Sequence, residues 1–185
     1  MKNNMVQCNY IKTLEVLQMS DKISLFFDMD GVLADFYSDP NYLNRMREKG
    51  YFANLKPLPM VNTVAELSLR FNVFDIYVLS ACVEPVEQCM QEKHEWLDKY
   101  LSTVPKENRI LIEAGKNKFD YVPKGIEMPI LFDDYSKNIE QWEERGGYAF
   151  KIKNNINLRG NKDYRAILDR PSAADIMTAV MKILI

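Results

Sequence analysis

Aspartates are the residues of this sequence whose positions suggest chemistry. Asp28 and Asp30 follow the mostly apolar run ISLFF, Asp133 and Asp134 follow the apolar run ILF, and Ser80 ends a third such run. The 185 residues include 26 acidic side chains but a single histidine. This count excludes a metal site with several histidine ligands and argues against a Ser-His-Asp hydrolase. If the protein is an enzyme, its acids and bases are therefore expected to be carboxylates.

The elements that must position these residues are short apolar strands alternating with helices. Strands are predicted at the start of segment 23–31 and at 73–79, 109–112, 129–132 and 148–152, and helices at 39–50, 63–70, 84–101, 136–144 and 171–184. This alternation predicts an α/β fold, a parallel five-stranded sheet flanked by helices. Ligands of such sheets bind at the carboxyl ends of the strands, so Asp28, Ser80 and Asp133 are expected to meet at one edge.

Several carboxylates at one edge need a counter-charge. At an effective dielectric constant near 20, each close pair of like charges costs about 4 kcal/mol. Oxygen ligands without His or Cys favour Mg²⁺, which often contacts a substrate phosphate as well. Phosphate chemistry fits this arrangement, because one aspartate can attack phosphorus while another moves the protons. An EF-hand calcium loop is disfavoured, because position 12 counted from Asp28 is Asp39 and not a glutamate.

Four segments resemble one family of enzymes. DMDGVLADF, residues 28–36, resembles motif I of the haloacid dehalogenase superfamily, and in particular its 5′(3′)-deoxyribonucleotidase family. GYFANLKPLP at 50–59 resembles the cap segment of that family, KHEWL at 93–97 its K-x-x-W helix, and LFDD at 131–134 its LIDD motif. The segments occur in the family's order. The resemblance implies a Rossmann-like fold with a small helical cap inserted after strand one.

The resemblance also implies roles for the aspartates. Asp28 matches the nucleophile, which is also a metal ligand. Asp30 matches the general acid and base, and its backbone carbonyl is expected to bind the metal. Asp133 matches the residue that completes the Mg²⁺ site, and Asp134 the residue that supports it.

The phosphate-binding residues follow from the same comparison. Ser80 matches the serine of motif II, with the Ala81 backbone N–H beside it. The stretch GKNKFDY offers two candidates for the lysine of motif III. Lys118 fits better as a residue in the first turn of a helix, whereas Lys116 fits better when counted from strand three. We favour Lys118 and keep Lys116 as the alternative.

The cap residues and two departures from the family concern the substrate. Phe36, Tyr51 and Phe52 are candidates for stacking on a base or a sugar, although Tyr51 and Phe52 can equally be core residues of the cap. LSA at 79–81 replaces the Thr-Ser-Pro of mammalian members, and an inserted stretch, PKGIEMP, lengthens the loop before strand four. Both departures leave the phosphoryl site plausible and the substrate undecided.

The predicted organisation has three parts. Residues 1–20 form an N-terminal extension, residues 21–35 and 72–185 form the core domain, and residues 36–71 form the cap. The predicted function is Mg²⁺-dependent hydrolysis of 5′(3′)-(deoxy)nucleoside monophosphates through an aspartyl-phosphate intermediate. The alternatives are a phosphatase for a sugar phosphate or another small phosphometabolite, and a catalytically silent phosphate-binding module.

Composition limits the partners and the compartment. The net charge of −2 argues against binding a nucleic acid polymer, and no apolar run is long enough for a membrane span. The N-terminus lacks the apolar stretch of a secretion signal, and three cysteines without metal-binding spacing fit a reducing compartment. We therefore expect a cytoplasmic protein whose partner is a small phosphate ester, and we leave a homodimer open.

Overall fold

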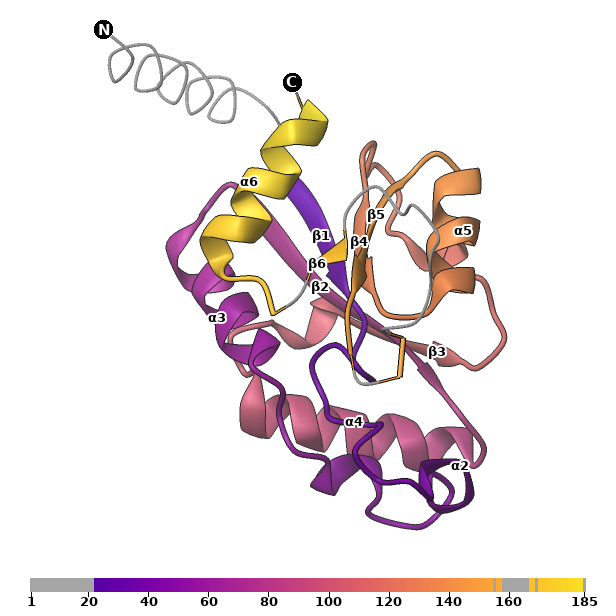
Figure 1. Ribbon diagram of the computed structural model, residues 1–185. Coiled ribbons are helices and arrows are strands. Elements are labelled where there is room, and N and C mark those ends of the chain that lie inside the picture. The colour runs from indigo at the N-terminus through magenta and orange to yellow at the C-terminus, as the bar shows by residue number, and fades with distance from the viewer. Residues whose placement is uncertain (1–21, 155, 158–166, 169, 185) are drawn as a thin grey trace, which may run out of the picture.

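A single parallel sheet organises the chain (Figure 1). The computed structural model describes residues 22–154, 156–157, 167–168 and 170–184, so the predicted N-terminal extension lies outside the described residues. The described strands form a six-stranded sheet in the order β3-β2-β1-β4-β5-β6. Their bounds are β1 Ile23–Phe27, β2 Phe74–Cys82, β3 Arg109–Glu113, β4 Ile130–Asp133, β5 Tyr148–Ile152 and β6 Ile167–Leu168.

Strand β1 lies between β2 and β4 in the middle of the sheet, and every one of its side chains is buried. Leu25 and Phe27 point into the larger hydrophobic core, and Phe26 points into a smaller core on the other face of the sheet. Alternate residues of a strand face opposite sides, so a strand buried on both sides is mostly apolar. This requirement explains why four of the five residues of β1 are apolar, with Ser24 as the exception, and why the aspartates begin only where the strand ends.

Helices cover both faces of the sheet. Helices α3 and α6 pack together on one face, and α5 packs against β4 and β5 on the other. Helix α4 lies across the carboxyl-end side of the sheet (Figure 1). The helix bounds are α2 Tyr42–Arg45, α3 Met60–Arg70, α4 Val86–Tyr100, α5 Ser136–Glu144 and α6 Ala173–Leu184, with 3₁₀ turns at Phe52–Asn54, Lys106–Asn108 and Lys118–Tyr121. None of the described helices is long and apolar enough to cross a bilayer.

The five predicted strands all form, and the α/β class with a parallel sheet is confirmed. The sheet is extended by β6, which pairs with the edge strand β5. A strand of two residues is too short to show any alternation of apolar residues, so no sequence pattern indicates it.

Two predicted helices differ from the observed ones by three residues or more at an end. The helix predicted at 39–50 is reduced to the four residues of α2, none of which is buried. A helix this short without a buried face has little to stabilise it. Helix α3 begins at Met60, three residues before the predicted start, directly after Pro59. Proline is well tolerated at the beginning of a helix because its missing N–H needs no partner there.

The segment between β1 and α3 is held against α4. The Trp96 indole N–H donates to the Leu55 carbonyl at 2.8 Å, and the chain returns beside motif I, where Leu58 N–H donates to the Leu33 carbonyl at 2.7 Å. Helix α3 itself contacts β2 and α6. The boundaries predicted for the cap, residues 36–71, remain a prediction.

Candidate active site

The carboxyl ends of β1 and β4 bring the two aspartate pairs together. Asp28 directly follows β1, and its N–H donates to the Phe132 carbonyl of β4 at 2.9 Å. Asp133 is the last residue of β4. Asp28, Asp133 and Asp134 are buried, and each offers a carboxylate oxygen within 4.8 Å of the other two. We call these three residues together with Asp30 the carboxylate cluster.

Lys118 bridges two members of the cluster. Its Nζ lies 2.7 Å from Asp28 Oδ1 and 2.7 Å from Asp133 Oδ2, and the side chain is buried. Burial disfavours the charged ammonium, but the carboxylates of Asp133 and Asp28 outweigh this effect and raise the pKa of Lys118. The Asn117 side chain accepts from Phe119 N–H at 3.0 Å and starts the 3₁₀ turn that carries the lysine.

The alternative lysine lies elsewhere. Lys116 Nζ is 3.7 Å from Glu113 Oε2, and both side chains are more than half exposed. The structure therefore brings Lys118 into the cluster and leaves Lys116 on the surface. The role of Lys118 in binding phosphate remains a proposal.

A second buried lysine joins Asp30 to Ser80. Lys93 Nζ donates to Asp30 Oδ2 at 2.6 Å, to Ser80 Oγ at 3.0 Å and to the Ala81 carbonyl at 2.7 Å. Asp30 Oδ1 is buried without a hydrogen-bond partner among the described residues. Burial is the main reason why the pKa of Asp30 is raised, and the nearby Asp28 adds to it. The role of Asp30 in proton transfer remains a proposal.

Sequence reasoning missed Lys93 as a site residue, although the K-x-x-W segment contains it. Cys89, Lys93, Trp96 and Leu97 are all buried on one side of α4. A lysine at helical spacing from apolar residues is usually a surface residue at the edge of the stripe. The sequence feature that could have identified Lys93 is its helical spacing, four residues after Cys89 and three before Trp96, both of which are buried.

Two asparagines support the other carboxylates. Asn138 Nδ2 donates to Asp133 Oδ2 at 2.9 Å, and Asn154 Nδ2 donates to Asp134 Oδ2 at 2.5 Å. Burial, together with the charges of Asp133 and Asp28, raises the pKa of Asp134 well above its usual value. Sequence reasoning identified neither asparagine, although Asn138 lies only five residues after Asp133, whereas Asn154 lies 20 residues after Asp134.

The donor set fits a divalent metal ion. Four carboxylates and two lysines contact one another in the described part of the chain, so the fully ionised cluster carries two uncompensated negative charges. Asp28, Asp133 and Asp134 offer oxygen ligands alone, the set that Mg²⁺ prefers. In this geometry Asp134 is itself placed to be a ligand, in addition to the supporting role expected of it.

The three cap residues that were candidates for stacking on a base or a sugar are buried. Phe36, Tyr51 and Phe52 are 8%, 8% and 2% exposed and pack on one another. The Phe52 ring also lies over Lys93 Nζ, 4.9 Å from its centroid. Stacking of these rings on a base remains a prediction, and their burial favours the alternative that they form part of the core.

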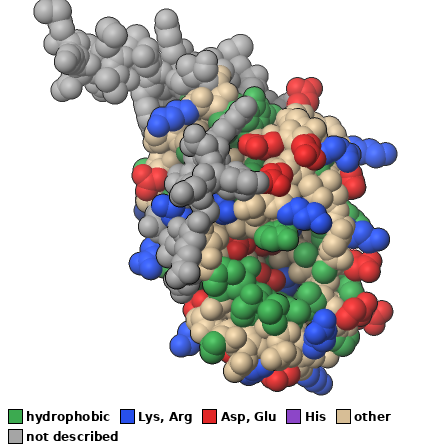
Figure 2. All heavy atoms as spheres, turned by 45° about the vertical axis from the view of Figure 1, so that its right-hand side comes forward, with side chains coloured by type: hydrophobic (Ala, Val, Ile, Leu, Met, Phe, Trp, Pro, Cys, Tyr) green, Lys and Arg blue, Asp and Glu red, His purple; other side chains and the backbone are tan. Residues whose placement is uncertain are grey.

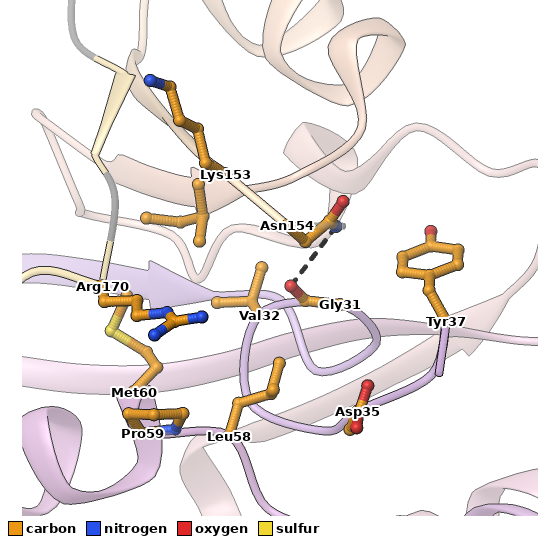
Figure 3. Close-up of a pocket in the computed structure, with 11 residues that line it drawn as sticks. Gly31, Val32, Asp35, Tyr37, Leu58, Pro59, Met60, Lys153, Asn154 and Arg170 are labelled. Atoms are coloured by element: carbon orange, nitrogen blue, oxygen red, sulfur yellow. Dashed lines mark hydrogen bonds between the residues drawn. The ribbon is translucent and has the colours of Figure 1, made fainter. Parts of the chain in front are cut away.

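A pocket adjoins the cluster at the motif I loop. It has a volume of about 700 Å³, and Gly31 and Asn154 form part of its wall, opposite Leu58 and Met60 (Figure 3). Pockets of this size take small molecules. On the face shown in Figure 2, charged side chains lie in a depression bordered by hydrophobic ones.

The fold resembles those of a solved phosphatase and of a solved haloacid dehalogenase-like hydrolase. The structure is similar to D,D-heptose 1,7-bisphosphate phosphatase from B. bronchiseptica, solved with magnesium and phosphate (TM-score 0.58, 10% identity, covering 87% of this chain and 99% of that chain). It is also similar to a protein of Burkholderia xenovorans LB400 provisionally named a haloacid dehalogenase-like hydrolase (TM-score 0.54, 10% identity, covering 90% and 100%).

Sequence comparison gives the family. Residues 39–170 match the model of the family described as 5′ nucleotidase, deoxy (pyrimidine), cytosolic type C protein, and the chain belongs to this family. A Vibrio phage KVP40 protein, provisionally named a 5′(3′)-deoxyribonucleotidase, is 27% identical over 138 residues, which cover 69% of this chain and 75% of that protein. The protein is therefore a phosphoric monoester hydrolase of the 5′-nucleotidase type, and the predicted family resemblance is confirmed.

Substitution of Gly31 tests how closely side chains pack around the motif I loop. It has a φ of +79°, and a Cβ would lie 2.5 Å from the Tyr37 ring and 2.7 Å from Asp134 Oδ2. Gly125 has a similar φ, +91°, with nothing within 4 Å of such a Cβ. Gly125→Ala should cost about 1–2 kcal/mol of unfolding free energy, from the backbone alone. Gly31→Ala should cost roughly 1–3 kcal/mol more, from the clash. Urea denaturation measures both, and equal losses would contradict the close packing at Gly31.

Proposed function

We propose that the protein hydrolyses (deoxy)nucleoside monophosphates with Mg²⁺ and an aspartyl-phosphate intermediate on Asp28. The observation that carries the chemistry is the bridge of Lys118 to Asp28 and Asp133, next to Asp30 with its unpartnered oxygen. The choice of a nucleotide rests on the family description and on the name of the phage relative. A cytoplasmic location is part of this proposal.

The proposed reaction has two displacements at phosphorus. In the first, an Asp28 oxygen attacks phosphorus, the bond from phosphorus to the ester oxygen breaks, and Asp30 gives its proton to the leaving alcohol. In the second, Asp30 takes a proton from water, the water oxygen attacks phosphorus, and the bond to Asp28 breaks to release inorganic phosphate. Asp30 thus ends the cycle protonated, as it began.

The surrounding groups have separate tasks. Lys118, and the Ser80 hydroxyl with the Ala81 N–H, would hold the phosphate oxygens, and Asp28, Asp133 and Asp134 would hold the metal. When bound, Mg²⁺ would neutralise charge on the transferring phosphoryl group. Lys93 would fix Asp30 through Oδ2 and leave Oδ1 for proton transfer. We further propose that the functional cap is residues 36–59, since α3 contacts the core elements β2 and α6.

Removing the nucleophile tests the proposal directly. Asp28→Asn should lower kcat by at least about 10⁴-fold in a phosphate-release assay with nucleotides and sugar phosphates, because the covalent step is lost. His94→Ala is the control and should leave kcat nearly unchanged. His94 is only half-buried, and its pKa is lowered mainly by burial and by Arg109, a residue outside the cluster. An Asp28→Asn variant that retains activity would exclude the mechanism. If the wild type preferred sugar phosphates, the substrate would be a sugar phosphate and not a nucleotide.

The two lysines give a matched pair of variants. Lys118→Met removes the charge that bridges Asp28 and Asp133 and should lower kcat/KM by about 10²–10³-fold. Lys116→Met removes a surface charge and should change kcat/KM by less than about twofold. Steady-state kinetics with one nucleotide measures both. A larger loss in Lys116→Met than in Lys118→Met would reverse the choice of the motif III lysine.

Metal binding can be measured without turnover. Mg²⁺ at about 100 times its dissociation constant should stabilise the fold by about 2.7 kcal/mol, seen as a rise in Tm. Asp133→Asn should abolish this rise, because Asp133 is one of the three proposed ligands. Asp120→Asn should retain it, since Asp120 pairs with Arg145 on the surface. A Mg²⁺-dependent rise of equal size in Asp133→Asn would place the metal elsewhere.

A further inference from the structure

Two adjacent charged residues of α4 are both buried and serve different segments. Glu92 is 5% exposed and Lys93 is 0% exposed. Neighbouring residues of a helix point in directions about 100° apart, so the two side chains reach different parts of the fold. Lys93 reaches Asp30 and Ser80, as described above, whereas Glu92 reaches the segment that follows Gly50.

Glu92 uses both of its oxygens on backbone N–H groups. Oε1 accepts from Gly50 N–H at 2.6 Å, and Oε2 accepts from Phe52 N–H at 3.0 Å. The Asn54 side chain closes the same turn by donating to the Gly50 carbonyl at 2.7 Å. Hydrogen bonds to a charged acceptor are the strong ones, and loss of the acceptor would leave buried N–H groups unsatisfied. The conformation of residues 50–52 therefore depends on Glu92.

The segment fixed by Glu92 contacts Lys93 through the ring of Phe52. Phe52 lies over Lys93 Nζ at 4.9 Å, and Lys93 in turn binds Asp30. Phe52 is also stacked on Phe36, with 6.0 Å between centroids and 8° between planes. Phe36 is the last residue of the motif I segment, 28–36. A chain of contacts therefore links Glu92 to Asp30. Glu92 binds the Phe52 backbone, the Phe52 ring contacts Lys93, and Lys93 binds Asp30.

We infer that Glu92 is a positioning residue that sets which leaving group the site accepts, an inference that rests on the proposed function. The carboxylate cluster and Lys118 contact the phosphoryl end of any substrate. Discrimination between phosphate esters must therefore come from the part of the protein that contacts the leaving group of the substrate. By holding residues 50–52, Glu92 fixes the Phe52 ring beside Lys93, which in turn binds Asp30, the residue that protonates the leaving oxygen.

The test compares two substrates in two variants. Glu92→Gln keeps the size but removes the charge and one acceptor, and Glu95→Gln is the matched control on the exposed side of α4. We expect Glu92→Gln to lower kcat/KM for thymidine 5′-monophosphate by about 10–100-fold, mainly through KM, with less than about a threefold change for p-nitrophenyl phosphate. Glu95→Gln should change neither. Hydrogen exchange should rise at residues 50–55 in Glu92→Gln alone.

A second variant keeps the test open if Glu92→Gln does not fold. Phe52→Leu leaves the backbone N–H groups bonded to Glu92 but removes the ring over Lys93, and it should reduce the selectivity for the nucleotide in the same direction. Equal losses for both substrates, or an unchanged ratio in a folded variant, would overturn the inference alone. Absence of hydrolysis of either substrate by the wild type would overturn the proposed function and the inference together.

Discussion

The structure depends on one electrostatic constraint, the mutual repulsion of four carboxylates held at one edge of a sheet. Each close pair costs about 4 kcal/mol at an effective dielectric constant of 20. Lys118 between Asp28 and Asp133, and Lys93 against Asp30, offset part of this cost. The remaining negative charge is suited to a divalent cation. The strands and the helices that bury the cluster have to hold this arrangement against repulsion, which is a reason for the buried hydrogen bonds around it.

Helix α4 is the element through which this constraint reaches the rest of the fold. Its buried face carries Lys93 toward the cluster, Glu92 toward residues 50–52, and Trp96 toward the Leu55 carbonyl. A buried charge without a partner is costly, so these side chains fix α4 relative to both segments. Hydrogen bonds of α4 side chains therefore connect this helix both to the cap segment and to Asp30.

Much of the fold could be predicted from sequence, because apolar strands buried on both faces leave an obvious pattern, as in β1. The carboxyl ends of those strands also predicted that Asp28 and Asp133 lie close together, as they do in the structure. Patterns failed where the determining contact is distant in sequence. Spacing could not separate Lys116 from Lys118, since the contacts that distinguish them join Lys118 to Asp28 and Asp133 on other elements. Lys93 was not recognised as a site residue, because its partners Asp30 and Ser80 lie on other elements.

The cap segment has no hydrophobic core of its own. Phe36, Tyr51 and Phe52 belong to the same core cluster as Leu25 and Phe27 of β1. A cap that shares its core with the sheet cannot change its inner surface without affecting packing close to the site. A change of leaving-group preference is therefore easier to achieve at residues that do not share this core than at the rings themselves. Glu92 is such a residue. Its hydrogen bonds to the backbone of Gly50 and Phe52 set the position of the Phe52 ring, so a change at Glu92 can alter leaving-group preference while the ring itself is kept.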